Sequence, residues 1–208
     1  MELSLRLRLR YQCSALGRWI SRQTLLALAL ALLARSAAAS ADEALWQRLA
    51  KEPNLVVLMR HAQRASGSPL AWDPSGACKG EAMLTDKGRA HARRIGEAFR
   101  ERGIKPRIVI SSPVCRCKET ARLAFQLDPV EDPLLREIGS GDSKRAAEFE
   151  RKALSLIAAG RGAVPVIFVS HQPNIDLLSL ELVEYGDLVV ATMNDHGELS
   201  VVGRLNVR

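Results

Sequence analysis

Three short apolar segments constrain the fold of this 208-residue chain more than any other feature of its sequence. They cover residues 54–59, 107–110 and 164–169, and apolar residues are nearly continuous in each. A strand that is apolar on both faces is typical of a parallel sheet with helices on both sides. The sequence therefore predicts an α/β fold, a three-layer sandwich with a mostly parallel central sheet.

Segments with helical spacing of apolar residues lie between these strands and are expected to form the outer layers. Thr85 or Asp86 can cap the second expected helix, and Gly103 can end it. The expected helices cover residues 42–52, 84–104, 114–127, 143–160 and 173–183. The expected loops cover residues 62–83 and 128–142, and a terminal hairpin or pair of edge strands covers residues 187–194 and 198–206.

The first 41 residues form a separate unit. Residues 1–23 are arginine-rich, residues 24–34 are almost wholly apolar, and residues 35–41 are small and end in an A-x-A pattern. This order is typical of a secretory signal peptide, and the apolar run is too short to span a bilayer comfortably. We expect cleavage near Ala41, a mature domain of residues 42–208 that is periplasmic or secreted, and no stable membrane insertion afterwards. An uncleaved N-terminal anchor is the alternative.

The charge of the chain depends on this cleavage. The whole chain carries 30 Lys and Arg against 23 Asp and Glu, a net charge of +7. Residues 1–41 hold six of the arginines and one of the glutamates, so the mature domain has a net charge near +2. It also lacks clusters of aromatic and basic residues on which bases could stack. We therefore expect no nucleic-acid partner.

Three cysteines remain in the mature domain after Cys13 has left with the signal peptide. Cys115 and Cys117 are two positions apart in an expected helix, so their side chains point to different sides. In an oxidising compartment, any disulfide must therefore join Cys78 to one of these two. The alternative is that all three are small packing residues.

Polar residues follow the three buried strands at the points where they end. Arg60 and His61 end the first, Arg116 lies in the helical turn after the second, and His171 follows the third. The carboxyl ends of parallel strands meet at one edge of a sheet. Arginine matches phosphate oxygens, and a histidine ring nitrogen can attack phosphorus. The sequence therefore predicts a phosphate-monoester site. Arg64 is a further candidate phosphate contact, with a solvated arginine as the alternative.

Other chemistries have weaker support in the sequence. His61 and His171 could begin a zinc site, but each would lie beside an arginine, which disfavours a second cation, and no third ligand has suitable spacing. Neither a P-loop nor a G-x-S-x-G motif is present. We therefore expect neither a metal nor a cofactor. His91 is expected to be solvated on an arginine-rich helix and His196 to lie in a turn, both without a role.

Four segments together resemble the histidine phosphatase superfamily, which has the phosphoglycerate mutase-like fold. They are LVVLMRHAQR, LTDKGRAHARRIGEAF, VISSPVCRCKETA and VIFVSHQPNI, and they span about residues 54–182 in the order of the family. The resemblance implies that His61 is the nucleophile that becomes phosphohistidine. It also implies that Arg60 and Arg116 hold the phosphoryl group and that His171 stabilises the transition state.

The resemblance also suggests a general acid in the mid-chain loop. In LLREIGSGD this acid is Glu137, with Asp142 as a substitute. The loop is shorter than in many relatives and leaves little room for a cap domain, so we expect an open site. An open site suits a bulky substrate or a broad set of small ones.

The size, the signal and the opening LWQRLAKEPNLVVLMRHAQR look like small periplasmic members that act on a lipopolysaccharide core heptose phosphate. The expected partner is therefore a phosphorylated small molecule or glycolipid. A phosphohistidine protein phosphatase, a mutase and a non-catalytic phosphosugar-binding module are the alternatives.

Overall fold

A six-stranded sheet forms the centre of the computed structural model, which describes residues 24–27, 42–66 and 72–207. The strand order is β3-β2-β4-β1-β5-β6. The strands are β1 (Leu55–Arg60), β2 (Val109–Ser111), β3 (Val130–Glu131), β4 (Val166–Ser170), β5 (Leu188–Met193) and β6 (Leu199–Leu205). The first four pair in parallel, whereas β5 runs antiparallel to both β1 and β6. The mostly parallel sheet and the terminal hairpin are thus confirmed.

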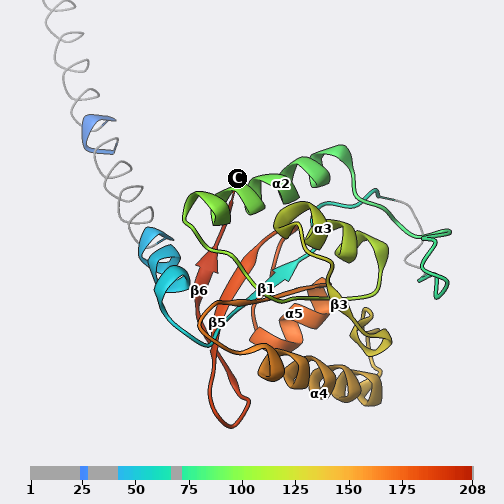
Figure 1. Cartoon of the computed structure of the whole chain (residues 1–208). Helices are drawn as coiled ribbons and strands as arrows, with labels where there is room; N and C mark the ends of the chain where they lie inside the picture. The colour runs from blue at the N-terminus through green and yellow to red at the C-terminus, as the bar shows by residue number, and fades with distance from the viewer. Residues whose placement is uncertain (1–23, 28–41, 67–71, 208) are drawn as a thin grey trace, which may run out of the picture. The chain divides into compact units, whose positions relative to one another are not determined.

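Helices cover both faces of this sheet (Figure 1). Their bounds are 42–51 for the first helix after the N-terminal segment, α2 (Asp86–Glu101), α3 (Cys115–Phe125), α4 (Ser143–Gly160) and α5 (Gln172–Ser179). Side chains of α2 and α3 share one apolar core with the sheet, and those of α4 and α5 share the other. This arrangement is the expected three-layer sandwich.

Strand β1 shows why the sequence needs two covering layers. Val57 and Met59 pack in the core under α2 and α3, whereas Val56 and Leu58 pack in the core under α4 and α5. All four side chains are fully buried. Because successive strand residues point to opposite faces, only a strand covered on both sides can be apolar throughout.

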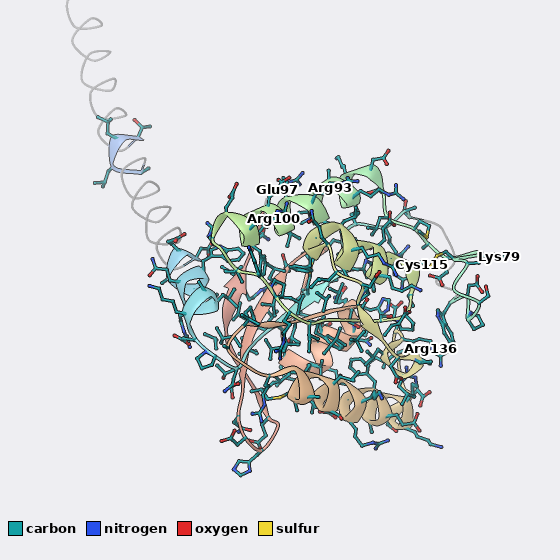
Figure 2. All side chains as sticks on the ribbon, viewed as in Figure 1. Lys79, Arg93, Glu97, Arg100, Cys115 and Arg136 are labelled. Carbon is teal, nitrogen blue, oxygen red and sulfur yellow. A yellow bond between two sulfur atoms is a disulfide. The ribbon has the colours of Figure 1, made fainter. Side chains whose placement is uncertain are left out.

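Helices α2 and α3 approach each other closely at a glycine. A Cβ atom on Gly96 would collide with the carbonyl oxygen of Ala124 in α3. The opposite side of α2 is polar, and Arg93 and Glu97 lie on it in the solvent (Figure 2). Thr85 caps the helix by accepting a hydrogen bond from the Gly88 N–H across 3.0 Å.

Two of the expected segments differ from the structure. The expected loop 128–142 contains the short strand β3 and a 3-10 turn, Pro133–Leu135. The expected helix 173–183 ends at Ser179, because Leu180 adopts a left-handed conformation with φ of 58° and turns the chain back toward β1. Two residues of strand and one turn are too short to give a periodic pattern.

The proposed signal peptide, residues 1–41, lies outside the described residues except for 24–27, which are helical. Within the part of the chain that the structure describes, no helix has both the length and the apolar character needed to cross a membrane.

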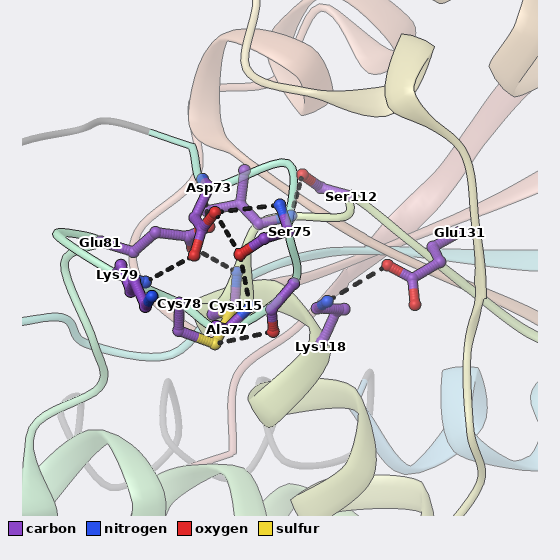
Figure 3. Close-up of a disulfide and its surroundings, with 12 residues drawn as sticks. Asp73, Ser75, Ala77, Cys78, Lys79, Glu81, Ser112, Cys115, Lys118 and Glu131 are labelled. Carbon is purple, nitrogen blue, oxygen red and sulfur yellow. Dashed lines mark hydrogen bonds and ion pairs between the residues drawn. A yellow bond between two sulfur atoms is a disulfide. The ribbon is translucent and has the colours of Figure 1, made fainter.

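A disulfide joins Cys78 to Cys115 and links the loop before α2 to the first turn of α3 (Figure 3). Its two cysteines are 37 residues apart, and closing a loop of this size stabilises a fold by about 2–4 kcal/mol. The buried Glu81 strengthens the link, because its carboxylate accepts from the Cys115 N–H across 2.6 Å and from the Asp73 N–H across 2.8 Å. Cys117 remains a buried free thiol.

The contact at Gly96 predicts a loss of stability on substitution. Although alanine favours helices, Gly96→Ala should lower the free energy of unfolding by about 1–3 kcal/mol, because α2 and α3 must move apart. Urea unfolding would measure this loss. Gly162→Ala is the control, since a Cβ there meets no atom within 4 Å. Equal stability of Gly96→Ala and the parent would contradict the close packing.

Candidate active site

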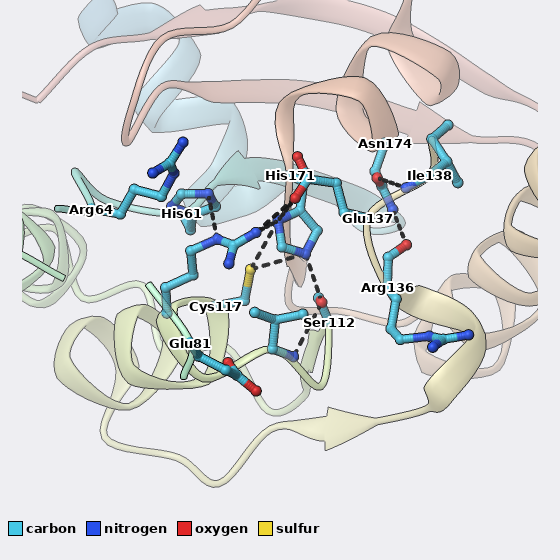
Figure 4. Close-up of polar contacts among 12 residues, drawn as sticks. His61, Arg64, Glu81, Ser112, Cys117, Arg136, Glu137, Ile138, His171 and Asn174 are labelled. Atoms are coloured by element: carbon cyan, nitrogen blue, oxygen red, sulfur yellow. Dashed lines mark hydrogen bonds and ion pairs between the residues drawn. The ribbon is translucent and has the colours of Figure 1, made fainter. Parts of the chain in front are cut away.

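The carboxyl ends of β1 and β4 lie side by side, and one histidine follows each strand. Arg60 pairs with Ser170 in this parallel ladder, so His61 and His171 follow at the same level of the sheet. The His61 N–H donates to the Ser170 carbonyl across 2.9 Å, and the two imidazole centroids are 5.5 Å apart. The two rings can therefore act on one small group bound at this edge (Figure 4).

Arg116 joins the two histidines to a carboxylate. Its side chain is only 1% exposed, and it enters the site from the first turn of α3. Nε donates to His61 Nε2 across 3.2 Å, while Nη2 lies 2.7 Å from Glu137 Oε2 and 3.0 Å from His171 Nδ1. The third nitrogen, Nη1, is buried without a partner among the described residues. A bound anion could satisfy this donor.

The hydrogen bonds of His61 determine which ring nitrogen can react. Nδ1 lies 2.8 Å from the carbonyl oxygen of Ala62, and since a carbonyl only accepts, Nδ1 carries the proton. Nε2 therefore holds the lone pair and points at Arg116. This is the nitrogen that could attack phosphorus once a phosphate takes over Arg116.

The second imidazole has the same kind of fixed tautomer. His171 Nδ1 accepts from Arg116, so Nε2 carries the proton and donates to Ser112 Oγ across 2.8 Å. The same hydroxyl lies 3.3 Å from the Val114 N–H at the start of α3. Ser112 thus holds the His171 ring in position.

Burial keeps both imidazoles neutral. Burial lowers the pKa of His61 to about 3, helped by the charges of neighbouring arginines, with Arg116 foremost, and opposed by its backbone hydrogen bond. Burial, followed by the charge of Arg116, also places the pKa of His171 well below its usual value. A neutral ring keeps the lone pair that a nucleophile needs.

Arg60 and Arg64 lie at the edge of this cluster. Arg60 Nη1 donates to the Val183 carbonyl across 2.7 Å, and its guanidinium lies 4.0 Å from the centroid of the Tyr185 ring. The same tyrosine ring lies 5.5 Å from the ring of His61. Arg64 Nη1 donates to the carbonyl of the following residue, and the charges of both arginines contribute to the lowered pKa of His61.

The two candidate acids lie in different surroundings. Glu137 belongs to the cluster, and its Oε2 lies 3.6 Å from His171 Nδ1. Asp142 instead caps α4 by accepting from the Arg145 N–H across 2.9 Å. The structure therefore brings Glu137, but not Asp142, into contact with a histidine.

Asn174 was not recognised from the sequence, yet it fixes the backbone on both sides of Glu137. Its fully buried amide accepts from the Ile138 N–H across 3.1 Å and donates to the Arg136 carbonyl across 3.0 Å. One amide in a helix gives no periodic signal, so sequence reasoning could not identify it. Ser112 was noted only as part of the end of the second strand and Tyr185 was missed, because a single side chain in a loop or turn does not show its contacts in the sequence.

The expectation for His91 was wrong. Its ring is half-buried, and Nε2 lies 2.6 Å from the Val207 carbonyl, because the C-terminal residues return across α2. His196 lies exposed in the hairpin turn, as expected. The described residues contain no group of three or more His, Cys, Asp and Glu side chains placed to hold a metal ion.

A model of the "Histidine phosphatase superfamily (branch 1)" matches residues 56–155. The chain belongs to the histidine phosphatase superfamily. Membership in this superfamily supports a phosphatase activity. The matched range contains Arg60, His61, Arg116 and Glu137, and it ends before His171.

Solved structures of this superfamily have the same fold. One, assigned as the phosphohistidine phosphatase SixA of Agrobacterium tumefaciens, is 22% identical, with a TM-score of 0.52 over 74% of this chain and 99% of that one. A mycobacterial glucosyl-3-phosphoglycerate phosphatase with VO3 is 18% identical, with a TM-score of 0.57 over 74% and 100%. A phosphoserine phosphatase of Entamoeba histolytica is 15% identical, with a TM-score of 0.52 over 74% and 98%. No curated protein matches the chain.

The neutral histidines of this phosphatase predict a loss of stability in acid. Below about pH 6.5 the unfolded chain protonates each ring, whereas folded His61 resists protonation down to about pH 3. Stability should therefore be complete above pH 6.5 and should fall toward pH 3, by up to about 1.4 kcal/mol per pH unit for each ring. Urea unfolding between pH 7 and pH 5 would measure the slope. A slope unchanged in both His61→Gln and His171→Gln would contradict this origin.

Proposed function

We propose that this protein is a metal-independent phosphatase that hydrolyses a phosphomonoester through a phosphohistidine on His61. The observation that carries the proposal is the set of contacts of Arg116 with His61, Glu137 and His171. A phosphate bound to Arg116 would lie within reach of all three groups. Charge stabilisation and positioning are the main requirements of phosphoryl transfer.

In the first step, the lone pair of His61 Nε2 attacks phosphorus. A P–N bond forms, and the bond from phosphorus to the ester oxygen breaks. Arg116, with Arg60 and Arg64 as further contacts, binds the phosphoryl oxygens. His171 stabilises the transition state by donating a hydrogen bond to these oxygens from Nδ1, once its ring proton has moved from Nε2 to Nδ1 and the Ser112 hydroxyl donates to Nε2.

Glu137 is the proposed proton donor to the leaving oxygen. The incoming phosphate displaces Glu137 from Arg116, and the freed carboxylate takes up a proton from solvent, which it then gives to the leaving oxygen. In the second step water attacks phosphorus, the P–N bond breaks, and Glu137 takes the proton from the water. When phosphate leaves, Glu137 returns this proton to solvent and pairs with Arg116 again, so the free site is restored.

The proposed location is the periplasm or the cell exterior, and the proposed substrate is a lipopolysaccharide core heptose phosphate. The order of residues 1–41 supports export. The disulfide between Cys78 and Cys115 supports it independently, because such bonds persist in oxidising compartments. The resemblance to small periplasmic phosphatases supports the substrate.

A phosphohistidine protein phosphatase is the second candidate. The structural likeness to SixA supports it, because the chain covers 99% of the length of that protein. A P–N substrate needs less help from an acid than an alcohol ester does. A dependence of the rate on Glu137 therefore separates the two candidates.

Phosphate release from a chromogenic phosphomonoester tests the mechanism. The parent should turn over equally with and without EDTA, and His61→Ala should lose turnover by at least about a thousandfold, because the nucleophile is gone. His196→Ala, which alters an exposed histidine in the hairpin turn, is the matched control and should keep the parent rate.

The same assay tests the acid. Glu137→Gln should slow a sugar phosphate by about a hundredfold and a nitrophenyl phosphate much less, because a nitrophenolate leaves without a proton. Equal slowing of both esters would assign Glu137 a role in binding instead. Loss of parent activity in EDTA would overturn the metal-independent mechanism.

Cell fractionation tests the location and the substrate together. The protein should be recovered in the periplasm or medium with residues near 1–41 removed, as the mass would show. Lipopolysaccharide from cells that express the parent should contain less phosphate than that from cells expressing His61→Ala. An unprocessed cytosolic protein would favour the phosphohistidine substrate, and an unchanged phosphate content would exclude the lipopolysaccharide.

A further inference from the structure

A hollow of about 390 Å³ opens beside Glu137. Its wall includes Trp72, Arg136, Asp142 and Arg145, and Glu137 itself forms the end next to the histidines. Because Glu137 also contacts Arg116, the hollow continues directly from the proposed phosphoryl site. None of the steps proposed above uses Arg136 or Arg145.

The two arginines of the hollow are not paired with carboxylates. Arg136 Nε donates to the Pro133 carbonyl across 3.0 Å, and its guanidinium lies 4.4 Å from the centroid of the Trp72 ring. Arg145 Nη2 donates to the Leu134 carbonyl across 2.7 Å. Among the described residues, neither guanidinium has a carboxylate within the 4.0 Å of an ion pair. Both positive charges therefore remain available to a ligand.

Arg145 also has a donor that no described residue satisfies. Its Nη1 atom is buried and lacks a hydrogen-bond partner. Burial lowers the pKa of Arg145 and the nearby charge of Arg136 lowers it further, whereas the charges of Glu148, Asp142 and Asp132 oppose this shift. Two guanidiniums that repel each other around an unfilled hollow form an arrangement that a bound anion would stabilise.

The carboxylate of Asp142 lies on the wall of the hollow and offsets part of the charge of Arg145 without forming an ion pair with it. Its Oδ1 accepts from the Arg145 backbone N–H, so it is directed at the N-terminus of α4, where a negative charge is favoured. Glu137 is directed the other way, at Arg116 and His171. The two acids thus have partners of their own, and Arg136 and Arg145 line the hollow beside them.

We propose that this hollow binds a second anionic group, a carboxylate or a phosphate, on the alcohol part of the substrate. The inference rests on the proposed function, because it requires the reacting phosphate to bind at Arg116. If Glu137 gives its proton to the leaving oxygen, the alcohol part must lie on the Glu137 side of the site. The hollow and its two arginines are on that side, so the substrate class is a phosphomonoester with a second negative group.

Steady-state kinetics with matched substrates test this class. 3-Phosphoglycerate differs from glycerol 3-phosphate by a carboxylate, and glucose 1,6-bisphosphate differs from glucose 1-phosphate by a second phosphate. The parent should have a KM about tenfold or more lower for the doubly anionic member of at least one pair, since charge-assisted hydrogen bonds are strong. The pair with the larger difference identifies whether a carboxylate or a phosphate is bound.

Substitution of the arginines separates binding from a structural role. Arg145→Gln and Arg136→Gln should each raise KM about tenfold for the preferred substrate with two anionic groups. They should leave kcat, and the KM of the matched substrate that lacks the second group, nearly unchanged. Arg151→Gln, which removes an exposed positive charge from the same helix, should change none of these values.

Several results would overturn the proposal. One is a parent that does not distinguish the members of either pair, and another is an equal rise of KM for both members in the arginine variants. Loss of all turnover in the parent would instead reject the proposed function. In that case, calorimetric binding of 3-phosphoglycerate and glycerol 3-phosphate to the parent and to Arg145→Gln still tests the hollow, because a preference that depends on Arg145 supports it and equal binding refutes it.

Discussion

A guanidinium buried at the edge of a sheet is the constraint on which the rest of this site depends. Removing such a charge from water costs several kcal/mol unless partners surround it. Arg116 has partners on two of its nitrogens, namely two neutral imidazoles and Glu137. Neutral rings and one carboxylate leave the cluster short of negative charge, and a phosphate supplies the missing charge. A bound phosphate therefore offsets the free energy that burial of Arg116 costs, and this raises the affinity of the site for a dianion.

The surrounding structure holds Arg116 and Glu137 from opposite sides. On one side, the disulfide at Cys115 and the carboxylate of Glu81 fix the turn of α3 from which Arg116 projects. On the other side, the amide of Asn174 fixes the backbone that carries Glu137. Both supports are buried and polar, and their hydrogen bonds are satisfied, so the ion pair between them has little freedom to move.

The sequence predicted best those features that depend on residues close together in the chain. Uniformly apolar strands predicted the sheet, and the residues at their ends predicted that His61, Arg116 and His171 would meet. Contacts between distant segments gave no such signal. Whether Cys78 joins Cys115 or Cys117 depends on how the loop before α2 folds back. The burial of the His91 ring depends on the return of the C-terminal residues across α2. The two arginines of the hollow have the sequence pattern of solvated helix and loop residues.

The central position of β1 has a consequence for the biogenesis of the protein. Val56 pairs with Val166 on one side, and Val57 pairs with Val190 on the other. One edge of this apolar strand therefore stays open until β4 has been made, and the other edge stays open until β5 has been made. Such an edge is prone to pair with other chains, and a nascent chain of this topology needs shielding by a chaperone. For the same reason, His61 and His171 cannot meet before β4 has been made and has paired with β1.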